Sequence, residues 1–178
     1  RNWSVSICIE YRVFTASLAD GFEDWDGQMS NHRGQPLWVG PLDVPTTHDW
    51  QRGRYTLCYA RRRLWNLIRD TPNLTWLILT KRPQNIASMM PTGAWPNVWL
   101  GATVEDDENR WRIDQLLDAP QVVPVRFLSC EPLIGPLEIR GSLGPNAISW
   151  VIIGGESGTG ARSMNMTWVR SLVEQCHD

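Results

Sequence analysis

The chain has 178 residues, of which 42% are hydrophobic and 20% are charged, and its formal net charge is -2. This composition is that of a globular protein with a hydrophobic core, and it excludes intrinsic disorder and a collagen-like repeat. The small negative charge gives no general attraction to nucleic acid or to a membrane, so contact with either would need a local basic patch.

Five short apolar runs predict strands that are buried on both faces, because such strands lose the alternation of half-exposed ones. They cover residues 12–20, 74–82, 98–105, 125–131 and 148–156. Between most of them, amphipathic patterns predict helices at residues 57–70, 83–90, 107–118 and 167–176. The repeated units predict an α/β domain with a parallel sheet and right-handed crossovers. Such a sheet is either open and doubly wound or closed into a barrel.

Apolar spacing in two of these helices favours a buried face. The residues concerned are Leu57, Leu64, Leu67 and Ile68 in the first helix, and Trp111, Leu116 and Leu117 in the third. Tryptophan is abundant, with 11 residues, and core packing is the favoured explanation over a base-stacking surface.

Residues 21–56 interrupt the pattern with glycines and prolines and no sustained period. A connection of this length is usually a lid or a binding insertion, so a single domain over residues 1–178 with this insertion is predicted. The segment follows the first strand and is therefore placed to cover the carboxyl ends of the sheet. His32 and His48 lie in it, and they are either solvated loop histidines or take a metal or acid–base role.

Charged residues close every one of the predicted strands. They are Asp20, Lys81 with Arg82, Glu105, Glu131 and Glu156. Because the carboxyl ends of parallel strands meet at one edge and carry the active sites of such folds, these residues predict a single charged site there. The alternative is that each charge only marks the point at which a strand leaves the core.

A glycine-rich stretch, "IIGGESGTGAR", follows the last predicted strand. Gly154 and Gly155 would let a ligand approach the backbone, Glu156 can accept from an amine or hydroxyl, and Arg162 can hold a carboxylate or phosphate. The stretch lacks both the GK[ST] ending of a Walker loop and the GxGxxG spacing of a dinucleotide site.

Cysteine usage favours reduced thiols. Cys8, Cys58, Cys130 and Cys176 are scattered without a CxxC pair, which suggests neither a disulfide framework nor a zinc site. Cys130 alternates away from its polar neighbours and is expected to be a buried small hydrophobe. No apolar stretch approaches the roughly 20 residues of a membrane span and no signal peptide is visible, so a cytoplasmic protein without a membrane partner is predicted.

An ordered set of segments carries a family resemblance. It comprises "RVFTASLADGFEDW", "NLTWLILTKRPQNI", "PNVWLGATVED", "VRFLSCEPLIGPL" and "WVIIGGESGTGARSMNMTWVRSLVEQC". The set resembles a family of phage and prophage proteins of unknown function that is related to the radical S-adenosylmethionine barrel enzymes. The resemblance implies a partial or full TIM-like barrel whose mouth is lined by Ser17, Asp20, Lys81, Arg82, Glu105, Ser129, Glu131, Gly154, Gly155, Glu156 and Arg162.

The chain departs from that family at its first strand. Family members carry a cysteine cluster for a [4Fe–4S] centre upstream of it, and this sequence has only Cys8 there. The family's strand after the last helix is also missing, and the sequence begins with Arg, so a fragment or a degenerate gene is expected. The resemblance implies S-adenosylmethionine and [4Fe–4S] as cofactors, but the cluster is not expected in this chain.

Three functions remain open from the sequence. The first is a truncated or cluster-less radical enzyme that binds a nucleotide or S-adenosylmethionine-like ligand and whose full-length form modifies nucleic acid or nucleotides. In that case Glu156 and its glycines would hold the methionine group, Lys81 and Arg82 would hold an anion, and the carboxylates would act in catalysis. Those carboxylates are Asp20, Glu105 and Glu131.

The second function is a metal-carboxylate hydrolase or lyase that acts on a phosphorylated substrate, with Asp20, Glu105, Glu131 and Glu156 as oxygen ligands. The third is a binding module without catalysis. Nucleic acid is a possible partner through the basic run "ARRRLWNLIR" at residues 60–69, although such a run is usually a solvated face.

Overall fold

The computed structural model describes residues 11–15, 20–25, 33–35 and 56–177. The chain divides into two compact units, which are described separately: Arg1–Phe22 with Pro72–Asp178, and Glu23–Thr71. Most of the predicted insertion at residues 21–56, with His32 and His48, lies outside the described residues. The single domain with a lid therefore stays a prediction.

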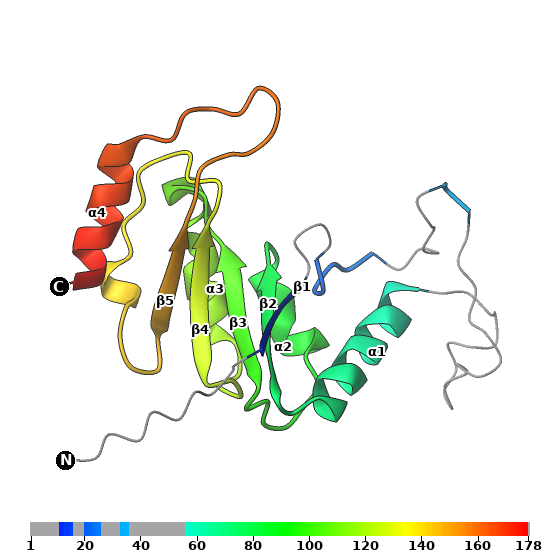
Figure 1. Ribbon diagram of the computed structural model, residues 1–178. Coiled ribbons are helices and arrows are strands. Elements are labelled where there is room, and N and C mark those ends of the chain that lie inside the picture. Colours follow the sequence, from blue (N-terminus) through cyan, green and yellow to red (C-terminus); the bar gives the residue numbers. More distant parts are fainter. Residues whose placement is uncertain (1–10, 16–19, 26–32, 36–55, 178) are drawn as a thin grey trace, which may run out of the picture. The chain divides into compact units, whose positions relative to one another are not determined.

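A parallel sheet forms the centre of the first unit (Figure 1). Its strands lie side by side in chain order and are β1 (Tyr11–Thr15), β2 (Leu74–Thr80), β3 (Val98–Thr103), β4 (Val125–Cys130) and β5 (Ile148–Ile153). The predicted α/β class and parallel sheet are thus confirmed. Within the described part of the chain β1 and β5 are the edges, so the sheet is open and is not closed into a barrel.

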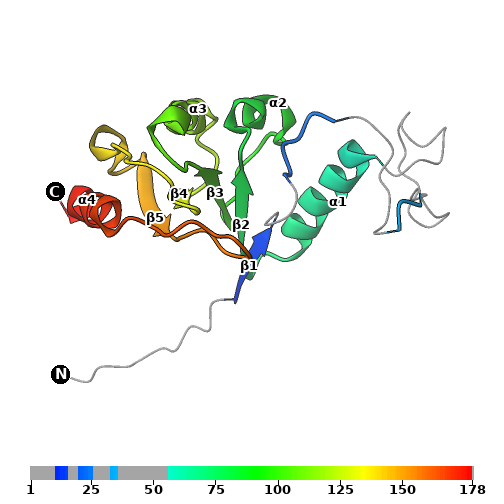
Figure 2. The ribbon, with the colours of Figure 1, turned by 90° about the horizontal axis from the view of Figure 1, so that it is seen from above.

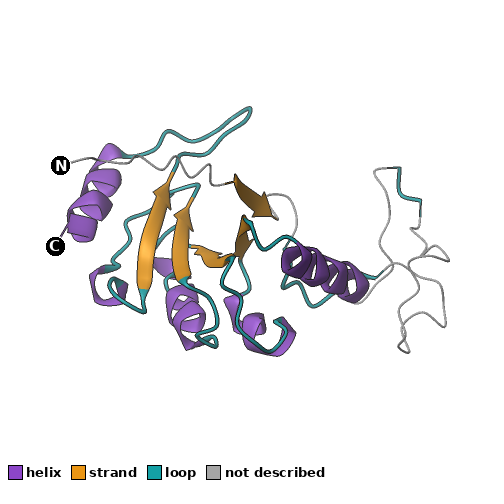
Figure 3. Ribbon diagram, turned by 60° about the horizontal axis from the view of Figure 1, so that its bottom comes forward, coloured by secondary structure: helices purple, strands orange, loops and turns teal. Residues whose placement is uncertain are grey.

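The helices follow the predicted order. They are α1 (Leu57–Asp70), α2 (Ile86–Met89) after a 3-10 turn at Pro83–Asn85, α3 (Trp111–Asp118) after a 3-10 turn at Asp107–Asn109, and α4 (Met166–His177). Figure 2 shows α2 and α3 next to each other on one face of the sheet, as right-handed crossovers between consecutive neighbouring strands require. Figure 3 shows the helices in purple and the strands in orange. None of the described helices is long and apolar enough to cross a membrane.

Helix boundaries follow from local chemistry. The Thr56 hydroxyl accepts from the Tyr59 amide at 3.3 Å and begins α1, whereas Asp106 accepts from the Asn109 amide at 3.1 Å and begins the turn before α3. Pro83 starts the turn after β2, because proline fits the first helical positions and cannot continue a strand ladder.

The buried faces of two helices match the expected ones only in part, since Ile68 in α1 and Leu116 in α3 are buried as predicted. In α1 the buried side chains are Tyr59, Trp65 and Ile68, while Leu67 is 49% exposed. In α3, Trp111 is 46% exposed. Trp111 is the first residue of α3, and a side chain at the end of the buried stripe can reach solvent. The pattern of apolar residues alone therefore does not determine which of them are buried.

The middle of the sheet is tightly packed around one glycine. Gly101 in β3 lies against the Phe127 ring of β4, and a Cβ built on Gly101 would come within 2.4 Å of that ring. Phe127 is fully buried and also contacts Trp150 of β5, with ring centroids 5.6 Å apart. Gly101 therefore leaves the space that the aromatic side chain fills.

The segment after β4 continues the sheet's hydrogen bonding at its carboxyl end. The Ile134 amide donates to the Glu105 carbonyl at 3.0 Å, and the Leu133 amide donates to the Gly154 carbonyl at 2.8 Å. Buried Gln175 of α4 accepts from the Ile139 amide at 2.6 Å and donates to the Leu137 carbonyl at 3.0 Å. The first two bonds fix the backbone at Glu105 and Gly154, and the Gln175 bonds attach α4 to the segment after β4.

Candidate functional site

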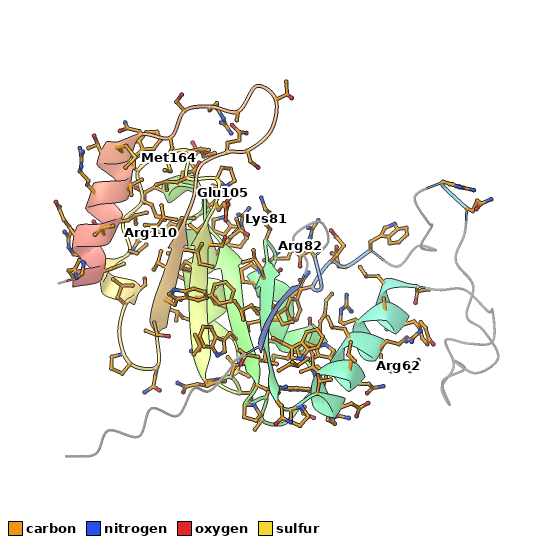
Figure 4. All side chains as sticks on the ribbon, in the orientation of Figure 1. Arg62, Lys81, Arg82, Glu105, Arg110 and Met164 are labelled. Carbon is orange, nitrogen blue, oxygen red and sulfur yellow. The ribbon has the colours of Figure 1, made fainter. Side chains whose placement is uncertain are left out.

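The charged residues predicted at the strand ends lie just beyond the strands. For example, β2 ends at Thr80 and β3 ends at Thr103, so Lys81 and Glu105 fall in the turns that follow. We call the set that follows the strands the carboxyl rim; it comprises Asp20, Lys81, Arg82, Glu105, Glu131, Gly154, Gly155 and Glu156. Figure 4 shows Lys81, Arg82 and Glu105 at this end of the sheet. Ser17, which was also predicted for the site, lies outside the described residues.

Asp20 joins the region after β1 to the end of β2. Its carboxylate accepts from the Thr80 hydroxyl at 2.6 Å, from the Lys81 amide at 2.8 Å and from the Phe22 amide at 2.9 Å. Both carboxylate oxygens are used in these bonds. Asp20 therefore fixes the position of the turn that carries Lys81.

Lys81 and Glu105 connect the ends of β2 and β3. The Lys81 ammonium lies 2.6 Å from Glu105 Oε1, and the two side chains are 54% and 10% exposed. Since an ammonium has more donors than this one bond uses, Lys81 can offer N–H groups to a ligand in solvent. Arg82 adds a second cation, and its amide donates to the Thr80 hydroxyl at 2.9 Å.

Arg112 of α3 holds Glu105 from the other side. Its Nη1 lies 2.7 Å from Glu105 Oε2 and also donates to the Thr103 carbonyl at 2.9 Å. Two cations thus flank one carboxylate, so the Lys81–Glu105–Arg112 cluster carries a net positive charge. The Nε of Arg112 is buried and has no hydrogen-bond partner among the described residues.

Arg112 was not among the predicted site residues, because those residues lie at or after the predicted strand ends and Arg112 lies in a helix. The available signal was the place of Arg112 beside Ile113, which is buried, at the start of the helix that follows Glu105. A charged residue next to the buried stripe of a helix can reach back over the end of the preceding strand.

Glu131 and Gly154 bring the ends of β4 and β5 together. A Cβ built on Gly154 would come within 2.8 Å of the Glu131 carboxyl carbon, so the carboxylate lies over the glycine backbone. Gly155 similarly faces Met164, whose Cβ would be 3.4 Å from an added Cβ. Ser129, on β4, is buried, and its carbonyl accepts from the Val104 amide at 3.0 Å.

Glu156 and Arg162 bind each other rather than a neighbouring strand. The Glu156 carboxylate accepts from Arg162 Nε at 2.7 Å, Nη2 at 3.1 Å and the backbone amide at 2.9 Å. This forked pair closes the loop that carries Gly158 and Gly160, both with positive φ. Any ligand that takes either charged group has to compete with this pair.

The loop ion pair predicts a specific pH response. Hydrogen bonds from the Arg162 side chain and then from its amide lower the pKa of Glu156 from 4.5 to about 2. A depressed folded-state pKa stabilises the fold above the ordinary pKa, and that contribution disappears as pH falls from 4.5 towards 2. We expect Arg162→Ala to return the pKa of Glu156 towards 4.5, measured by carboxyl NMR titration. An unchanged pKa of Glu156 would contradict the role of the Arg162 pair. Arg170→Ala is the control and should leave the pKa of Glu156 unchanged.

The described cysteines do not form a cluster site. Cys130 is fully buried, and burial raises the pKa of its thiol to about 12, which fits the expected buried small hydrophobe. Cys58 and Cys176 are exposed, and Cys8 lies outside the described residues. Among the described residues, no three of His, Cys, Asp and Glu gather as metal ligands.

A family model described as a protein of unknown function (DUF5131) matches residues 55–178, which is more than half of the chain. The chain belongs to this family. No curated protein and no solved structure matches it. The family description names no activity, so the relation to phage proteins and to radical S-adenosylmethionine enzymes stays a prediction.

The part of the chain that matches the DUF5131 family contains most of the carboxyl rim. Residues 55–178 include β2 to β5, the Lys81–Glu105–Arg112 cluster, Glu131 with Gly154, and the Glu156–Arg162 pair. Asp20 and Ser17 precede the matched region. The family membership therefore applies to the turns that carry the cations.

Proposed function

We propose that the carboxyl rim binds a nucleotide or an S-adenosylmethionine-like ligand, with Lys81 and Arg82 holding its phosphate or carboxylate group. The observation that carries this proposal is the Lys81–Glu105–Arg112 cluster. Its central carboxylate is flanked by two cations, and the outer one, Lys81, is half exposed. The excess positive charge of this cluster, at the carboxyl ends of β2 and β3, suits an anionic ligand.

Each rim residue has a distinct part in this proposal. Lys81 supplies free N–H donors, and Asp20 holds the turn that carries it. Arg112 holds the Glu105 carboxylate in place. Gly154 leaves space for the Glu131 carboxylate over its backbone, and this carboxylate is available to accept from a hydroxyl or an amine.

A partial TIM-like barrel is part of the same proposal. Consecutive parallel strands in the order of the chain, with α2 and α3 on one face, are the arrangement from which such barrels are built. The proposal places this domain in a protein whose full-length form modifies nucleic acid or nucleotides. Because the described residues do not supply ligands for the implied [4Fe–4S] cluster, no chemical step is assigned to it.

The metal-carboxylate alternative has less support. Asp20 uses its oxygens on Thr80 and Lys81, and Glu156 uses its oxygens on Arg162. Glu105 lies between two cations, which oppose binding of a further cation. Three of the four carboxylates of the described rim, those of Asp20, Glu105 and Glu156, thus pair with donors and cations of the protein itself.

Replacing Lys81 and Arg82 together with alanine tests the proposal. We expect the double variant to keep its far-ultraviolet spectrum and to lose about tenfold or more in affinity for ATP or S-adenosylmethionine, because each charged hydrogen bond is worth more than a neutral one. Isothermal titration calorimetry measures the affinity.

The matched control is Arg140→Ala with Arg170→Ala, which removes two exposed cations elsewhere. It should bind like the unaltered protein. The proposal fails if the unaltered protein binds neither ligand, if the Lys81 and Arg82 variant binds normally, or if that variant unfolds, which would show that the pair is structural.

A further inference from the structure

Arg126 is a buried cation far along β4 from the carboxyl rim. It is the second residue of that strand, whereas Ser129 and Cys130 lie at the rim end. Only 6% of the residue is exposed. Burial lowers the pKa of its guanidinium, because the charged form loses hydration.

The partners of Arg126 carry no negative charge. Nη2 donates to the Ala119 carbonyl at 2.7 Å and Nη1 donates to the Asn146 carbonyl at 3.2 Å. Its Nε is buried without a hydrogen-bond partner, and within the described part of the chain no carboxylate pairs with the side chain. A guanidinium has more N–H donors than these two carbonyls use, and buried charges in proteins are normally paired.

A cavity opens beside this side chain. Its volume is about 400 Å³, and Arg126 lines it together with Gln121, Pro124, Asn146, Ala147 and Ser149. The wall comes from the chain before β4, from the turn before β5 and from β5 itself. The remaining donors on the two terminal nitrogens can therefore meet a small ligand that enters between these segments.

We propose that this cavity binds a small oxyanion, such as phosphate or the carboxylate of a metabolite, on the terminal nitrogens of Arg126. The anion supplies the counter-charge that the chain does not provide. The side chain is held in place by its two carbonyl partners, so the donors are already oriented when the ligand arrives. This site lies at the opposite end of the sheet from the carboxyl rim and is independent of the function proposed there.

The experiment titrates inorganic phosphate, and separately acetate, into the unaltered protein and into the Lys81→Ala, Arg82→Ala protein, in which the two rim cations are absent. Calorimetry at constant ionic strength, maintained with chloride, should show saturable binding at one site. Binding of both anions indicates a general oxyanion site, and binding of one alone identifies the group. If neither phosphate nor acetate binds saturably, the proposal is overturned.

Two variants locate the binding. Arg126→Met should reduce the affinity by about tenfold or more. Ser149→Phe fills the cavity from an exposed position on β5 and leaves Arg126 in place. It should also reduce the affinity by about tenfold or more, and it replaces Arg126→Met as the test if that variant does not fold. Unchanged affinity in a folded Arg126→Met or Ser149→Phe protein would place the anion elsewhere and overturn the assignment.

Discussion

Replacing Arg112 with methionine is expected to destabilise the protein by about 3 kcal/mol, because breaking a buried ion pair from one side leaves the other charge without its partner. Glu105 is only 10% exposed, and Arg112 is the less exposed of its two cations, at 14% against 54% for Lys81. The variant also removes the bond to the Thr103 carbonyl. Urea unfolding at neutral pH measures the change.

Lys81→Met is the matched comparison, since it removes the other cation of the same carboxylate. Lys81 is half exposed, so solvent screens its pair and the loss should stay below about 1 kcal/mol. Equal losses of unfolding free energy for Arg112→Met and Lys81→Met would show that the buried and the exposed cation stabilise Glu105 equally, contrary to this prediction. Adding Glu105→Gln to Arg112→Met should recover part of the loss, because the unpaired buried charge is then gone.

Gly101→Ala is expected to cost about 3 kcal/mol, at the upper end of what overpacking a core usually costs. The added Cβ would lie 2.4 Å from the Phe127 ring, and that ring is fully buried against its neighbours. Neither strand can move away without breaking the ladder between β3 and β4. Thermal or urea unfolding provides the measurement.

Gly141→Ala is the control for this change, because nothing lies within 4 Å of a Cβ built there. It should leave the unfolding free energy almost unchanged. Phe127→Leu should lessen the cost of Gly101→Ala, so that the double variant loses less than the sum of the two single changes. Strict additivity would mean that the ring is not the cause.

The sequence predicted the order and type of the elements well. The apolar runs gave β2 to β5 to within a few residues, and the helix at 57–70 matches α1 at both ends. The predicted strands were too long because the run of apolar residues was extended to the next charge. A strand ends where its ladder ends, and the polar residue that caps it lies in the following turn.

Contacts across the rim were harder to predict. Strand order brings Lys81 near Glu105, but the sequence cannot show that Arg112 returns from α3 to share that carboxylate. It also assigned ligand roles to Glu156 and Arg162, which bind each other in the structure. Arg126 was not predicted as a site residue, because it lies inside the apolar run at residues 125–131 and was taken as part of the strand. Such pairings depend on side-chain reach in three dimensions.

The order of the strands also bears on how the sheet forms and opens. Lys81 and Glu105, at the ends of β2 and β3, are 24 residues apart, whereas Asp20 and Thr80, which tie β1 to β2, are 60 residues apart. Closing a loop costs about 0.6 kcal/mol more for each doubling of its length. Chain entropy therefore opposes the attachment of β1 more than that of β3, and β1 lies at an edge. Local unfolding should begin there and release Asp20, which loosens the turn of Lys81 before the rest of the sheet opens.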